Sequence, residues 1–66
     1  MKNNIASVRR SKKMTQKELA NKTGMHERNI QAIEAEIIAP RVANAMKIAG
    51  ALGVTVEELF SQSTPS

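Results

Sequence analysis

The sequence predicts an all-α fold of five short helices, and three observations support this prediction. Apolar residues recur at steps of three and four along most of the chain, which is the spacing of one face of an α-helix. No segment alternates apolar and polar residues with a period of two, so we expect no β-strand. Thr and Glu stand three positions apart at 15–18 and again at 55–58, the pattern of a capping box that starts a helix.

The first expected helix covers residues 4–12, with Ile5 and Val8 facing the core. The second begins at the capping box of Thr15 and ends before Gly24. A glycine at this point can adopt the positive φ of a tight turn without steric strain. The sequence therefore predicts two short helices followed by a sharp turn.

The third helix is expected over residues 26–35, with Ile30 and Ile33 on its buried side and Met25 just before it. The small Ala20 on the preceding helix lets the two helices cross closely. Two short helices joined across one glycine turn describe a helix-turn-helix, in which the second helix is held out so that it can enter a DNA groove.

The fourth helix follows Pro40 and ends at Gly53. Apolar residues recur along it at three- and four-residue steps and predict one apolar face: Val42, Ala45, Met46, Ile48, Ala49 and Leu52. The fifth helix begins at Thr55, and one of its faces carries Val56, Leu59 and Phe60. We expect one domain over residues 1–60 and a disordered polar tail over residues 61–66.

The net charge is +4, but the charge is unevenly distributed. Residues 1–22 hold seven basic residues against one acidic residue, whereas residues 23–66 hold three against five. A basic half suits the salt-dependent attraction to nucleic acid. Solvated cations on an ordinary surface explain the charge equally well, so the charge supports the motif and does not establish a function.

Composition argues against several other classes of protein. The chain has no cysteine and one histidine, so we expect neither a disulfide framework nor a structural zinc site. It has no aspartate and no glycine-rich phosphate loop, which does not favour an enzyme, and we expect no cofactor. Phe60 is the only aromatic residue, which disfavours single-strand or RNA binding by stacking. No signal peptide or membrane span is visible, and we expect a cytoplasmic protein without a membrane partner.

Seven pieces stand in a specific order along the chain: Arg9, TQKELA at 15–20, Gly24, Ile30, Ile33–Glu34, Pro40 and ALGVTVEELF at 51–60. In this order the chain from Ile5 to Phe60 resembles the Xre family of DNA-binding domains, also known as the Cro and phage-repressor type. The resemblance implies a compact, lambda-repressor-like bundle of five helices. It also implies that the third helix docks in the major groove, usually as a dimer on a two-fold symmetric operator.

The family's base-reading positions fall on His26, Glu27, Arg28 and Ala32, with Asn29 as a further candidate. Arg28 could bind guanine through two hydrogen bonds, Glu27 could accept from cytosine N4, and Ala32 could lie against a thymine methyl group. His26 could contact a phosphate or a base, or serve only as an imperfect helix cap. Glu27 and Arg28 could equally be solvated charges.

Gln16 matches the family glutamine that bridges a phosphate and steadies the third helix. The other expected phosphate contacts are Thr15, Lys17 and Arg41, with Arg10, Lys12 and Lys13 as weaker candidates. Arg9 and Glu34 match a family pair that forms a partly buried ion pair between the first and third helices. The resemblance therefore implies a structural role for Arg9.

The chain departs from the family after Glu34, where AEIIAP at 35–40 replaces Asn-Gly and basic residues. Glu36 stands where the family has the glycine that turns out of the third helix, so this helix could run longer or the loop could fold differently. Ile37 and Ile38 could mark a protein contact surface. Alternatively, at least one of them could tuck into the core, because Ile37 continues the apolar stripe of the third helix.

We therefore predict a sequence-specific transcriptional regulator, a repressor of phage, mobile-element or toxin–antitoxin type, that binds a double-stranded DNA operator. It is expected to form a homodimer through the fifth helix, with Val56 and Phe60 at the interface. The alternative is a protein-interaction module of antitoxin or repressor-partner type, which would use Ile37, Ile38 and the fifth helix and bind little DNA.

Overall fold

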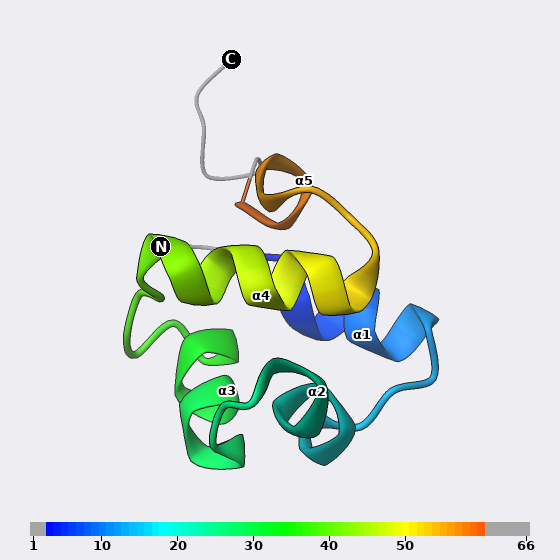
Figure 1. The fold of residues 1–66 in the computed structure, drawn as a ribbon, viewed down its shortest axis with the longest axis horizontal. Helices are drawn as coiled ribbons and strands as arrows, with labels where there is room; N and C mark the ends of the chain where they lie inside the picture. Colours follow the sequence, from blue (N-terminus) through cyan, green and yellow to red (C-terminus); the bar gives the residue numbers. More distant parts are fainter. Residues whose placement is uncertain (1–2, 61–66) are drawn as a thin grey trace.

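Five α-helices make up the part of the chain that the computed structural model describes, residues 3–60 (Figure 1). They are α1 (Ile5–Ser11), α2 (Gln16–Thr23), α3 (Glu27–Glu34), α4 (Val42–Leu52) and α5 (Val56–Phe60). No strand occurs within this range, so the predicted all-α fold is confirmed. The expected tail at 61–66 lies outside the described residues.

Helix α4 crosses the middle of the molecule, with α5 on one side of it, α2 and α3 on the other, and α1 behind (Figure 1). Each helix contributes at least one fully buried side chain to a single core: Ile5, Leu19, Ile30, Ile33, Ile48, Leu52 and Leu59. Burial of large aliphatic side chains is the main force that holds such a small domain together. The five helices therefore pack around one shared core.

Both predicted capping boxes are confirmed. At the start of α2, Thr15 Oγ1 accepts from the Glu18 amide at 3.0 Å, and Glu18 Oε1 accepts from the Thr15 amide at 2.8 Å. Thr55 and Glu58 repeat the arrangement at the start of α5, at 3.1 and 3.0 Å. The bond from the Thr15 amide to the charged carboxylate holds the pKa of Glu18 below its usual value of 4.5.

Four of the helices end in the same way, with one residue in the left-handed conformation after the last turn. In each case the amide of the next residue donates to the carbonyl oxygen five positions earlier, at 2.9 to 3.0 Å, which is a Schellman motif. The left-handed residues are Lys13, Gly24, Glu36 and Gly53, with φ of 57°, 71°, 66° and 72°. Lys13 and Glu36 carry a Cβ atom there, which costs about 1–2 kcal/mol relative to an unstrained residue.

The segment after α3 keeps a sharp turn although it lacks the glycine. Helix α3 ends at Glu34, and Glu36 adopts the left-handed conformation itself, so the helix does not run on. Ile37 is 76% exposed and Ile38 46% exposed. The alternative in which one of them enters the core is therefore wrong, because the left-handed turn at Glu36 leads the chain away from the buried stripe of α3.

The predicted apolar face of α4 is correct at four positions and wrong at two. Ala45, Ile48, Ala49 and Leu52 are buried, but Val42 and Met46 are 78% and 61% exposed. Three- and four-residue steps describe a stripe wider than the surface that the neighbouring helices cover. Val42 and Met46 therefore form an apolar edge of α4 that faces solvent.

Candidate nucleic-acid interface

Helix α3 buries one side and exposes the other. Ile30 and Ile33 are 0% and 2% exposed and anchor the helix in the core. At helical spacing, Arg28, Gln31 and Ala32 lie opposite this pair; Arg28 and Gln31 are exposed and Ala32 is half-buried. The outer side of α3 is therefore exposed at Arg28 and Gln31 and partly covered at Ala32.

The N-cap and the first turn of α3 carry four of the candidate base-reading residues. His26, Glu27, Arg28 and Asn29 are exposed, and together they line one shallow hollow of the surface. His26 occupies the N-cap position with an extended backbone, but its side chain makes no capping hydrogen bond. His26 is therefore a helix cap by position only, as in the imperfect-cap alternative, and its exposed ring lies at the end of the helix, where an ionic or hydrogen-bonding ligand can reach it.

The carboxyl end of α3 is held by a charged network. Arg9 Nε lies 2.7 Å from Glu34 Oε2 and Arg9 Nη2 lies 3.2 Å from Oε1, so the guanidinium and the carboxylate meet through two hydrogen bonds. Their side chains are 9% and 7% exposed. Arg9 Nη1 also donates to the carbonyl oxygen of Met14 at 2.8 Å. The guanidinium thus joins α1, the turn before α2 and the end of α3.

Gln16 belongs to the same network. Its Nε2 donates to Glu34 Oε1 at 2.9 Å, so this half-buried side chain links the first residue of α2 to the last residue of α3. A carboxamide nitrogen carries two hydrogens. Gln16 can therefore hold Glu34 and offer a second hydrogen to a phosphate oxygen.

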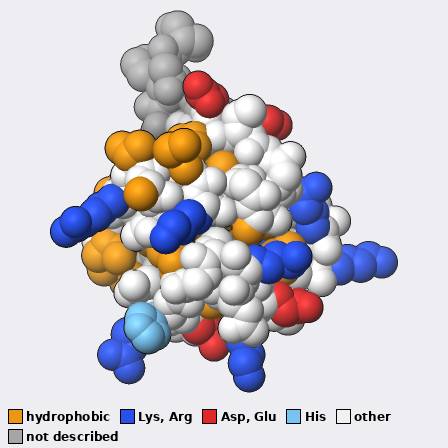
Figure 2. All heavy atoms as spheres, viewed as in Figure 1, with side chains coloured by type: hydrophobic (Ala, Val, Ile, Leu, Met, Phe, Trp, Pro, Cys, Tyr) orange, Lys and Arg blue, Asp and Glu red, His pale blue; other side chains and the backbone are white. Residues whose placement is uncertain are grey.

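The other candidate phosphate contacts are spread over separate elements. Thr15 accepts from the Glu18 amide and is thereby fixed at the start of α2, next to the exposed Lys17. Arg41 is exposed at the N-cap position of α4. Figure 2 shows basic side chains distributed around this face of the molecule rather than gathered in one patch. Such separated basic side chains can contact the phosphates of a DNA backbone at several points.

Gln31 is a candidate that the sequence analysis missed. It is exposed on α3, three residues after Arg28 and four after Glu27, and so lies on the same side of the helix. Its carboxamide can donate to and accept from an adenine edge. The spacing of three residues from Arg28 could have identified Gln31 in the sequence, but Gln31 is not among the base-reading positions of the family.

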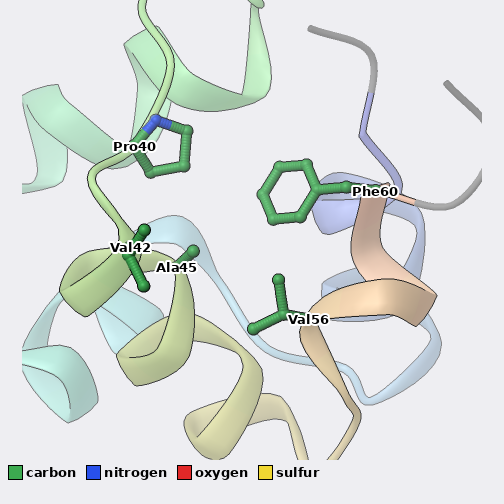
Figure 3. A pocket seen from close by; sticks show the side chains of 5 residues that line it. All are labelled: Pro40, Val42, Ala45, Val56 and Phe60. Atoms are coloured by element: carbon green, nitrogen blue, oxygen red, sulfur yellow. The ribbon is translucent and has the colours of Figure 1, made fainter. Parts of the chain in front are cut away.

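The candidate interface residues fall into two separate groups. Val56 and Phe60 line an apolar groove of about 220 Å³ together with Pro40, Val42 and Ala45. In Figure 3 the ring of Phe60 points toward Pro40 across this groove, with Val42 and Ala45 on α4 forming its floor. Ile37 and Ile38 stand on the turn after α3 and do not line the groove.

None of the helices described between residues 3 and 60 combines the length and the hydrophobicity of a membrane-spanning segment. In the comparison with known proteins, a family model described as helix-turn-helix matches residues 5–59. Over 60 residues the chain is 38% identical to an uncharacterized HTH-type transcriptional regulator of Methanocaldococcus jannaschii, and the alignment covers 91% of each chain. The chain therefore belongs to the Xre-type helix-turn-helix family, a family of DNA-binding transcriptional regulators.

Proposed function

We propose that this protein is a sequence-specific repressor that inserts α3 into the major groove of double-stranded DNA. The observation that carries the proposal is the construction of α3: Ile30 and Ile33 fix one side in the core, Glu34 fixes its end, and the opposite side is open. The major groove of B-DNA is about 12 Å wide and admits one α-helix. A helix that is rigid on one side and bare on the other fits that groove.

Base reading falls to the outer side and first turn of α3. Arg28 can donate two hydrogen bonds to guanine, Gln31 can pair with adenine, and Ala32 can lie against a thymine methyl group. Glu27 can accept from cytosine N4 and disfavours bases that present acceptor atoms to its carboxylate, such as guanine O6 and thymine O4. His26 and Asn29 flank these side chains and can reach a base edge or the adjoining phosphate.

Phosphate contacts would position the helix in the groove. Gln16, Thr15 and Lys17 stand at the amino end of α2, where free backbone amides and the helix dipole favour an anion. Arg41 stands at the start of α4, on the other side of α3 in the sequence. Contacts from two elements on either side of α3 would hold it along the groove without adding sequence information.

We further propose that a second copy of the chain covers the groove between α4 and α5. Val42 and Met46 extend this apolar surface onto the exposed edge of α4. A two-fold axis through the groove would bring α4 of one copy against α5 of its partner, so the apolar side chains of the two copies would cover one another.

One observation favours the second candidate function, a protein-interaction module. Ile37 is 76% exposed on the turn after α3, where a phosphate-contacting residue would be expected in a DNA-binding member of the family. An exposed pair of isoleucines can anchor a protein partner. This candidate predicts little or no retention of duplex DNA.

Selection of bound duplexes from a random pool tests the proposed function. A dimeric repressor should enrich a two-fold symmetric sequence whose half-sites lie about one helical turn, or 34 Å, apart. The logarithm of affinity for the selected duplex should fall in proportion to the logarithm of salt concentration. A pool that stays random after repeated selection in dilute salt would favour the protein-interaction module.

A further inference from the structure

Two adjacent residues before α1 connect the carboxyl ends of α3 and α5. Asn3 Nδ2 donates to the carbonyl oxygen of Ile33, in the last turn of α3, at 2.9 Å. The backbone amide of Asn4 donates to the carbonyl oxygen of Leu59 at 2.7 Å, and Asn4 Nδ2 donates to that of Glu58 at 3.2 Å, both in α5. One short segment therefore binds two helices that are separated in the sequence by α4.

The bond from Asn3 is not needed to satisfy the backbone of α3. The carbonyl oxygen of Ile33 already accepts from the Glu36 amide at 3.0 Å, as part of the turn that ends the helix. Asn3 donates to the second lone pair of the same oxygen. Its own Oδ1 accepts from the Ile5 amide at 3.1 Å, so the side chain is fixed at both ends. Asn3 therefore contributes a connection between the start of α1 and the end of α3.

We propose that Asn3 and Asn4 form a clasp that fixes the position of α3 relative to α5. The two helices lie on opposite sides of α4 (Figure 1), and the clasp joins them directly. Its consequence rests on the proposed function: α3 reads DNA, and α5 borders the groove that takes a second copy. The clasp then sets the distance between the two reading helices of a dimer, and with it the preferred spacing of half-sites.

Two conservative variants separate the clasp from ordinary helix capping. Asn3→Asp keeps the oxygen that accepts from the Ile5 amide and removes the donor to α3. Asn4→Asp removes the side-chain donor to α5 and keeps the backbone bond. Asn21→Asp serves as the matched control, because Asn21 is exposed on α2 and the substitution adds the same negative charge away from the clasp.

The first measurement needs no DNA. The chain contains no cysteine, so Gln31→Cys on α3 and Glu57→Cys on α5 provide two unique sites for spin labels. Labelled chains are diluted with unlabelled chains so that pulsed electron paramagnetic resonance reports distances within one chain. The clasp predicts one narrow distance distribution in the parent and in Asn21→Asp, and a broader one in Asn3→Asp, which lacks the donor to α3. Asn4→Asp should broaden it less, because the backbone bond to Leu59 remains. An unchanged distribution overturns the proposal.

The second measurement compares duplexes that carry one half-site with duplexes that carry two half-sites at varied spacing. Asn3→Asp should lose about fivefold in affinity at the best spacing relative to Asn21→Asp, a loss typical of one hydrogen bond, and should discriminate less between spacings. Its affinity for a single half-site should match that of Asn21→Asp. Equal losses on one and two half-sites would overturn the spacing consequence. If the parent binds no duplex, the proposed function fails, and the distance measurement still decides the clasp.

Discussion

Arg9 and Glu34, 25 positions apart in the sequence, meet through two hydrogen bonds of 2.7 and 3.2 Å beneath the surface where α1 meets the end of α3. Removing one partner of a buried pair strands the other charge, so Arg9→Ala should destabilise the fold by about 3–5 kcal/mol. A domain of this size has little stability to spare, and the variant should be largely unfolded at room temperature.

Thermal unfolding followed by circular dichroism measures this effect. Arg10→Ala is the matched control, because Arg10 is the neighbouring residue on α1 and is exposed; its melting temperature should stay close to that of the parent. A melting temperature for Arg9→Ala as high as that of Arg10→Ala would show that the pair does not support the fold.

Glu36→Gly should stabilise the protein. Glu36 holds a φ of 66°, which glycine adopts freely, and a Cβ atom there is strained. The expected gain in the free energy of unfolding is up to about 1 kcal/mol, after subtraction of the greater freedom of glycine in the unfolded chain. Glu36→Ala removes the charge but keeps the Cβ atom, so it should not reproduce the gain. Chemical denaturation of both variants decides, and a less stable Glu36→Gly would contradict this interpretation.

The capping box of α2 predicts a dependence of stability on pH. The pKa of Glu18 is lowered in the folded protein by the hydrogen bond from the Thr15 amide. The charged carboxylate therefore contributes its full stabilisation above about pH 4.5, and this contribution is lost as the pH falls through the lower, folded-state pKa. Glu18→Gln should melt below the parent at neutral pH, and the two should converge well below pH 4.5.

Glu57→Gln controls for net charge in this experiment, because Glu57 lies in the first turn of α5 but is not the partner of Thr55 in its capping box. The difference in melting temperature between Glu57→Gln and the parent should change less with pH than the difference between Glu18→Gln and the parent. A difference in melting temperature between the parent and Glu18→Gln that stays constant across the acid range would refute the link between Glu18 ionisation and stability.

Arg28→Ala and Arg41→Ala should impair DNA binding in different ways. Arg28→Ala loses a base contact, so its binding free energy for the preferred duplex should be weaker by about 1–3 kcal/mol, and its preference at one base pair should relax. Arg41→Ala loses a phosphate contact, so its affinity should fall equally for all DNA sequences. The slope of log affinity against log salt concentration should decrease by about 1. Competition between preferred and random duplexes over a salt series separates the two. Equal losses of Arg28→Ala on both duplexes would exclude base reading by this residue.

Met46→Lys tests the proposed dimer surface. Met46 is 61% exposed, so the substitution should leave the melting temperature of the monomer nearly unchanged. It should shift the monomer–dimer equilibrium toward monomer, because a buried lysine without a partner is unfavourable. Sedimentation equilibrium measures the shift, with Asn21→Lys on α2 as the control for added charge. A dimer as stable as that of the parent would place the interface elsewhere.

Local signals in the sequence predicted local structure well. The two capping boxes and the glycine turn at Gly24 depend on residues three or four positions apart, and each is present as expected. The turn at Glu36 was not predicted, because its residue type does not favour the left-handed conformation. There the hydrogen bonds from the Glu36 and Ile37 amides to the carbonyl oxygens of Ile33 and Ala32 close the turn, against the preference of the residue.

Long-range structure was harder to predict. Apolar spacing placed Met46 in the core, but which part of an apolar stripe becomes buried depends on where neighbouring helices lie. The contacts of Asn3 and Asn4 span 30 and 54 positions and leave no local pattern in the sequence. Gln31 was missed for another reason: family positions were followed where helical geometry would have included it.

Chemical-shift mapping of the backbone amides during titration with a duplex tests the central claim most directly. If α3 lies in the major groove, the largest shifts should fall on residues 26–32, with further shifts at Gln16 and Arg41. Shifts confined to the groove between α4 and α5, or spectra that do not change even in dilute salt, would contradict the claim that α3 reads DNA.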